Sequence, residues 1–133
     1  MLCLDTNVVI GIMSGRSAKA ARRLKHEIGS SLRIIVPAIV VYELRFGIAR
    51  SARRTANERA LDLFLSPLET PPFDANDAAE AADIRAGLND RGTPIGPYDI
   101  LIAAQARRRR ATLITGNKRE FRRVPTLAVQ DWS

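Results

Sequence analysis

Short runs of apolar residues without polar alternation limit the possible folds of this chain more than any other feature. We expect strands at Leu2 to Asp5, Arg33 to Val36 and Ala111 to Thr115, with a fourth at Thr126 to Val129. Segments with helical periodicity lie between them. Apolar strands that alternate with helices are typical of a parallel sheet covered on both faces. The sequence therefore predicts the α/β class.

The bounds of the helices are predicted from N-cap residues at their starts and from proline or glycine at their ends. They are expected after Ser17, from Ala38 to Ala49 behind Pro37, from a Thr55–Glu58 capping box to Pro67, from Asp77 to Gly92, and from Asp99 into the arginine run. The pair Thr6-Asn7 indicates a turn after the first strand, and Pro71-Pro72 permit only a short edge strand around Phe73.

Size and composition favour one globular domain over residues 1–133. With 133 residues, 46% of them hydrophobic, the chain is long enough for a substantial core. No apolar run reaches the ~18 residues that cross a bilayer, and the N-terminus lacks the basic start of a signal peptide. Cys3 has no partner for an internal disulfide and is expected to be a buried small hydrophobe. We expect a cytoplasmic protein that is not bound to a membrane.

The net charge of +7 comes from 21 basic and 14 acidic residues, and 18 of the basic residues are arginine. Such a surface attracts polyanions, and the arginine fork suits phosphate. An alternative stays open, because basic residues also solvate helix faces. It also stays open whether Arg107 to Arg110 bind RNA or solvate the end of a helix.

Several acids occupy unusual positions. Asp5 ends the first strand, Glu43 lies mid-helix among apolar residues, and Asp99 opens an apolar helix. Asn117 and Glu120 follow the strand that ends at Thr115, three residues apart and so on one helical face. Ligand sites of parallel sheets lie at the carboxyl ends of the strands, where these residues would meet.

Each acid also has a local explanation. Asp5 could form an Asx turn, Glu43 could pair with an arginine, Asp99 could stabilise a helix N-terminus, and Asn117 with Glu120 imitates a capping box. Thr115 could position water or phosphate, or simply pack at the strand end. Taken together, the carboxylates would repel one another, and a bound divalent cation resolves that conflict.

An all-oxygen acidic site suits Mg²⁺ or Mn²⁺. Zinc fits poorly, since the chain has one cysteine and one histidine, His26. A divalent ion lowers the pKa of bound water and stabilises charge on a phosphate, and the arginines would hold a polyanion. The residues therefore indicate a metal-dependent phosphodiesterase that acts on RNA or DNA.

Four motifs in order resemble the PIN-domain ribonucleases, and among these the VapC toxins of bacterial toxin–antitoxin pairs. They are LDTNVVI, VYELRFGIAR, GPYDILIAAQA and LITGNKREFRRVP, and the likeness spans the whole chain, including Asp131-Trp132. The resemblance implies a three-layer α/β/α sandwich, Mg²⁺- or Mn²⁺-dependent endoribonuclease activity, an RNA substrate such as tRNA, a cognate VapB-type antitoxin and a homodimer.

The same resemblance assigns roles to the acids. Asp5 and Asp99 become metal ligands, and Glu43 a ligand or a water-orienting group. The fourth site residue is Asn117 or Glu120, and we favour Glu120. The antitoxin would cover the acidic pocket and pack on Ile39 to Ile48 or Leu61 to Leu65. The alternative function is a non-catalytic basic module that binds nucleic acid or a partner, with the acids as caps and ion pairs.

Overall fold

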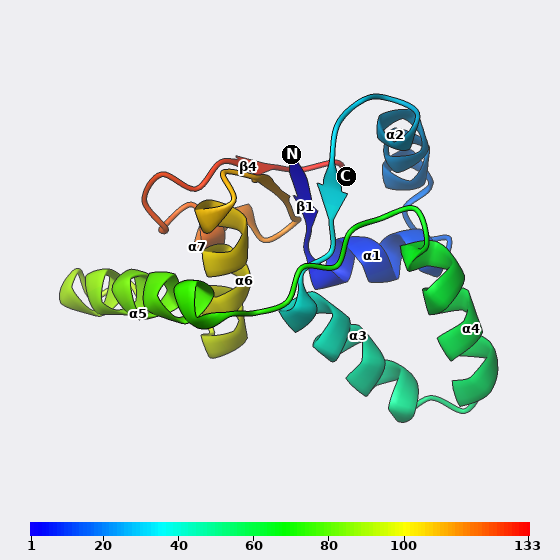
Figure 1. The fold of residues 1–133 in the computed structure, drawn as a ribbon, viewed down its shortest axis with the longest axis horizontal. Helices are drawn as coiled ribbons and strands as arrows, with labels where there is room; N and C mark the ends of the chain where they lie inside the picture. The colour runs from blue at the N-terminus through cyan, green and yellow to red at the C-terminus, as the bar shows by residue number, and fades with distance from the viewer.

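The computed structural model describes residues 1–133 and contains one four-stranded sheet (Figure 1). Its strands are β1 (Leu2–Leu4), β2 (Ile34–Ile35), β3 (Thr112–Ile114) and β4 (Val129–Gln130). They lie in the order β2-β1-β3-β4, and every pairing is parallel. The predicted α/β class with a parallel sheet is therefore confirmed.

Seven helices surround this sheet. They are α1 (Thr6–Met13), α2 (Ala18–Ile28), α3 (Ala38–Ala49), α4 (Arg54–Leu65), α5 (Ala75–Asp90), α6 (Pro97–Arg108) and α7 (Lys118–Phe121). None of them is long and apolar enough to cross a membrane.

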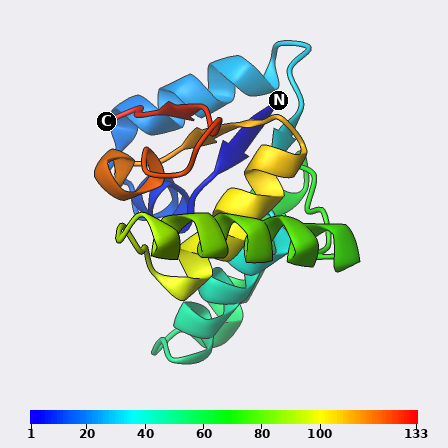
Figure 2. The same cartoon turned by 90° about the vertical axis from the view of Figure 1, so that its left-hand side faces the viewer.

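The central strands are buried because helices cover both faces of the sheet. In Figure 2, α2 lies above the sheet, while α6 lies below it with α5 packed across its outer side. Cys3 and Leu4 in β1 and Leu113 in β3 have no exposed surface. Cys3 is thus the buried hydrophobe that the sequence predicts, and burial raises the pKa of its thiol. The three-layer arrangement is confirmed.

The segment after β1 differs from the prediction. Instead of a turn at Thr6-Asn7, helix α1 starts at Thr6, and Asp5 is its N-cap. The Asp5 carboxylate accepts a hydrogen bond from the Thr6 N–H at 2.8 Å. Because Asp and Thr occur both in turns and at helix N-termini, the local signal was ambiguous.

Three other local predictions are wrong. Thr55 and Glu58 form no capping box, because α4 begins at Arg54 and Glu58 accepts from the Arg54 guanidinium instead. Phe73 lies outside any strand. The fourth strand begins at Val129, because the segment before it makes a turn with a positive φ of 62° at Thr126.

Helices α5 and α6 are fastened by an ion-pair cluster, which we define as Asp74, Asp77, Arg108 and Arg109. Asp77 is completely buried and accepts hydrogen bonds from both guanidinium groups at 2.7 Å. Asp74 accepts from Arg108 at 2.8 Å. The neighbouring Arg107 pairs with Glu80 at 3.0 Å. Three arginines of the run therefore serve packing between helices.

Candidate active site

Four carboxylates from different segments lie near one another at the carboxyl edge of the sheet. We call Asp5, Glu43, Asp99 and Glu120 the acid cluster. The first follows β1, and the others lie on α3, α6 and α7. Their mutual influence is visible at Asp99, where burial and then the charges of Asp5, Glu120 and Glu43 raise the pKa to about 6. The sequence prediction that these acids converge is consistent with this geometry.

Asp5 is held by two donors. Its carboxylate accepts from the Thr6 N–H and, at 2.7 Å, from the Thr115 hydroxyl at the end of β3. The residue is only 6% exposed. Burial raises its pKa, the two hydrogen bonds oppose that shift, and the charge of Glu43 adds to it. Asp5 is thus fixed in orientation by the edge of the sheet.

Thr6 connects Asp5 to Glu43. Its hydroxyl donates to a Glu43 carboxylate oxygen at 2.6 Å, while its N–H bonds Asp5. The sequence analysis missed Thr6 as a site residue because it was assigned to a turn. A hydroxyl directly after an acid at a strand end was the only signal for this role.

Asn117 and Glu120 act together. The Asn117 side chain donates to the Glu120 carboxylate at 3.3 Å, and its backbone N–H donates to the Thr115 hydroxyl at 3.0 Å. Asn117 does not cap α7 with its side chain. The structure therefore places the carboxylate of Glu120 near Asp99 and uses Asn117 to orient it.

The absence of a side chain at Gly96 leaves space for the Asp99 carboxylate. A Cβ at this position would lie 3.3 Å from an Asp99 carboxylate oxygen, tighter than an ordinary contact. Two tyrosines directly precede acids of the site: Tyr42 precedes Glu43, and Tyr98 precedes Asp99. Both rings are exposed, and their centroids are 5.6 Å apart. This aromatic pair was not predicted.

The acid cluster has no counter-charge from the protein, although the chain is rich in arginine. Nine of the 14 acidic residues form ion pairs with lysine or arginine. The five that form none are Asp5, Glu43, Asp90, Asp99 and Glu120, so four of the five are the acid cluster. Carboxylates that lose solvation without a partner are suited to a cation.

The donors match a hard divalent ion in kind, because all of them are carboxylate oxygens. As the side chains stand, no group of three His, Cys, Asp or Glu residues lies close enough to coordinate one ion. The predicted ligands Asp5, Glu43 and Asp99 therefore lie at one edge of the sheet, but their carboxylates are too far apart to coordinate the same ion. Ion binding requires these side chains to approach one another.

Comparison with known proteins identifies the family of the chain. The sequence model of the PIN domain matches residues 2–127. A ribonuclease VapC2 of Rickettsia felis is 33% identical over 97% of this chain and 96% of its own length. A tRNA(fMet)-specific endonuclease VapC of Salmonella typhimurium shows the same identity and coverage. The chain belongs to the PIN domain family, within its VapC group.

Solved structures agree with the sequence relatives. The crystal structure of VapBC2 from Rickettsia felis, bound to a promoter DNA fragment, contains a chain with a TM-score of 0.93 and 32% identity. The match covers 99% of this chain and 98% of the other. DNA-bound VapBC from Salmonella typhimurium gives a TM-score of 0.91 at 33% identity, with both chains fully covered. The predicted family and fold are confirmed.

Proposed function

We propose that this chain is a metal-dependent endoribonuclease toxin that hydrolyses RNA phosphodiester bonds and is inhibited by a VapB-type antitoxin. The observation that carries the proposal is the acid cluster, which is left without counter-charge in a chain of net charge +7. The names of the full-length relatives support RNA, and specifically tRNA, as the substrate.

Asp5, Glu43 and Asp99 would hold Mg²⁺ or Mn²⁺, with Glu120 as the fourth carboxylate. A bound ion lowers the pKa of water and stabilises negative charge on the scissile phosphate. The protein supplies the orientation: Thr115 fixes Asp5, Thr6 fixes Glu43, and Asn117 fixes Glu120. Burial and then the charges of the neighbouring carboxylates raise the pKa of Asp99, and a dication would relieve that repulsion.

A cleavage assay tests this function. We expect the wild-type chain, freed of any antitoxin, to cleave total tRNA with Mg²⁺ or Mn²⁺ and to stop in EDTA. Asp99→Asn removes a charge at nearly constant volume and should lower the rate by at least about 10²-fold, as the loss of an electrostatic catalytic group typically does. Asp83→Asn is the matched control, because its side chain is 83% exposed and lies on α5.

Two outcomes would contradict the proposal. Equal cleavage by wild type and Asp99→Asn would remove Asp99 from the site. RNA binding that neither Mg²⁺ nor EDTA alters, without any cleavage, would favour the alternative of a non-catalytic binding module.

A groove beside the acid cluster supports the antitoxin as partner. It lies between α1, α3 and α4, has a volume of about 360 Å³, and is lined by Ile10, Met13, Glu43, Leu44 and Ile48 among others. On the predicted antitoxin segments, Phe46 and Leu63 are exposed, whereas Leu61 is core. A helix in this groove would contact Glu43 and block access to the site. Binding of a VapB-type protein should therefore abolish cleavage.

Homodimer formation stays a prediction. Light scattering on the purified chain would test it by giving the mass of one or two copies in solution.

A further inference from the structure

A second site, distinct from the acid cluster, lies between α2 and the C-terminal segment. We name it the α2 pocket: a depression of about 390 Å³ lined by Lys19, Arg22, Arg23, Asp131 and Trp132. Figure 2 shows the C-terminal segment running along α2, with α7 beside its end.

The charges in the α2 pocket favour an anion. Arg23 pairs with Glu27 at 2.9 Å, and Asp131 lies 3.7 Å from the Lys118 ammonium group. Lys19 and Arg22 form no ion pair with Asp or Glu, and the Lys19 ammonium group donates only to the Ser133 carbonyl oxygen, at 3.3 Å. The local balance is therefore positive. The N-terminus of α2 adds to this potential, because Ser17 makes no side-chain capping bond and the first turn contains no acid. Arginine and lysine donors of this kind bind phosphate groups.

The indole of Trp132 forms the wall of the α2 pocket. The residue is 4% exposed, and the Arg23 guanidinium lies 5.5 Å from its ring centroid. Its Nε1–H is buried and has no acceptor within the protein. Buried donors in folded proteins nearly always have a partner. This indole is therefore a polar group that the fold alone does not satisfy.

The α2 pocket shares lining residues with a second cavity that borders the edge carrying the acid cluster. A smaller cavity of about 130 Å³ shares Asp131 and Trp132 with it and extends to Asn7 and Gly116. Those residues directly follow Thr6 and Thr115, which orient the acid cluster. The Thr115 N–H also bonds the carbonyl of Gln130, next to Asp131. An elongated ligand at the acid cluster would thus pass the α2 pocket.

An RNA backbone needs a positively charged binding site close to the acid cluster. Four carboxylates without counter-charge repel an incoming phosphate backbone, so attraction must come from cations at the border of the acid cluster. We propose that the α2 pocket binds a backbone phosphate of the RNA substrate, at a nucleotide that flanks the cleavage point. This inference rests on the proposed function. Lys19 and Arg22 are the principal contacts, and Trp132 with Arg23 forms the supporting wall.

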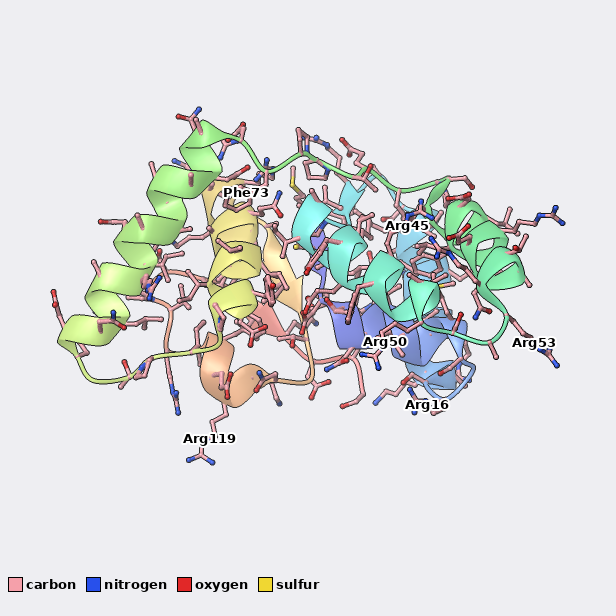
Figure 3. All side chains as sticks on the ribbon, turned by 90° about the horizontal axis from the view of Figure 1, so that it is seen from below. Arg16, Arg45, Arg50, Arg53, Phe73 and Arg119 are labelled. Carbon is pink, nitrogen blue, oxygen red and sulfur yellow. The ribbon has the colours of Figure 1, made fainter.

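The test compares two double variants with the same change of charge. Lys19→Gln/Arg22→Gln alters the α2 pocket. Arg53→Gln/Arg59→Gln is the control, because both arginines are exposed without an ion-pair partner, and Figure 3 shows Arg53 pointing outward at the start of α4. Circular dichroism and melting curves should show the same fold for both. Binding is measured by anisotropy of fluorescein-labelled total tRNA in EDTA, so that no cleavage occurs.

We expect the pocket variant to bind tRNA about tenfold more weakly than the control at moderate salt. The slope of log affinity against log salt should fall by about 1.4 to 1.8, as expected for the loss of two phosphate contacts. In cleavage assays its KM should rise while kcat stays near the control value. The chain has a single tryptophan, so intrinsic emission reports on Trp132 alone. Saturating tRNA should change that emission in the wild type.

Equal affinity and equal salt slopes for the two double variants would overturn the inference. An unchanged Trp132 emission at saturating tRNA would also overturn it. If the pocket variant lost affinity for the antitoxin while matching the control on tRNA, the pocket would be a protein contact instead. Because binding is measured in EDTA, these outcomes are separate from a failure of the wild type to cleave RNA, which would contradict the proposed function.

Discussion

The acid cluster and the ion-pair cluster use the same residue type in opposite ways. Asp77 is buried between Arg108 and Arg109. Burial raises its pKa, but the hydrogen bonds donated by the two guanidinium groups and by the Asp74 backbone N–H lower it further, to about 2. Asp99 forms no ion pair, and burial together with the charges of the other acid-cluster carboxylates raises its pKa to about 6. Acids that the protein neutralises fasten helices together, whereas acids that it leaves unneutralised indicate a binding site.

The largest expected effect comes from breaking the ion-pair cluster. Asp77→Ala leaves two partly buried guanidinium groups without their shared acceptor and removes the capping box of α5. Removing one partner of a buried pair typically costs about 3–5 kcal/mol of the free energy of unfolding. Urea denaturation measures this loss.

Asp90→Ala on the same helix is the control for that loss, because Asp90 is exposed and forms no ion pair. This substitution should change the free energy of unfolding by no more than about 0.5 kcal/mol. A loss of similar size in both variants would show that the ion-pair cluster does not fasten α5 to α6.

A smaller effect is expected inside the site, at the buried hydrogen bond from Thr115 to Asp5. Thr115→Val keeps the shape of the side chain but removes the donor. A hydrogen bond to a charged group contributes about 1.5–3 kcal/mol, and Asp5 would also lose its fixed orientation. We expect lower stability together with slower cleavage. Thr112→Val, in the same strand β3, is the control, and equal behaviour of the two variants would exclude a role for the hydroxyl.

The sequence could predict the sheet and the edge at which the acids lie, because both follow from local patterns. Apolar runs without alternation require a sheet buried on both faces, and parallel strands bring their carboxyl ends to one edge. Helix α3 was predicted at its observed bounds, Ala38–Ala49, since Pro37 marks its start unambiguously.

Contacts between distant residues could not be predicted in the same way. The Thr6 hydroxyl meets Glu43, which lies 37 residues away, and Arg108 meets Asp77 across 31 residues. A run of four arginines in the sequence indicates charge, and only the packing of α5 on α6 shows that three of them are occupied by acids. The α2 pocket likewise depends on the return of the C-terminal segment to α2.

The smallest expected effect is the pH dependence of the two acids, which should have opposite signs. The folded pKa of Asp99, about 6, lies above its ordinary 3.8, so in EDTA its ionisation lowers stability as the pH rises from about 4 to 6. The folded pKa of Asp77, about 2, lies below the ordinary value, so its contribution is present above pH 4 and is lost as the pH falls from about 4 to 2.

Melting curves of wild type and Asp99→Asn across these pH values isolate the contribution of Asp99 to the pH dependence of stability. Between pH 4 and 7 the wild type should lose stability relative to the variant, by less than about 1 kcal/mol because the carboxylate is partly solvated. Mg²⁺ at pH 7 should then raise the Tm of the wild type more than that of Asp99→Asn, since the ion replaces the missing counter-charge. Parallel curves for the two proteins at all pH values, with no difference in response to Mg²⁺, would mean that Asp99 is not repelled by the acid cluster. The contrast between the two acids would then come only from the hydrogen bonds that Arg108 and Arg109 donate to Asp77.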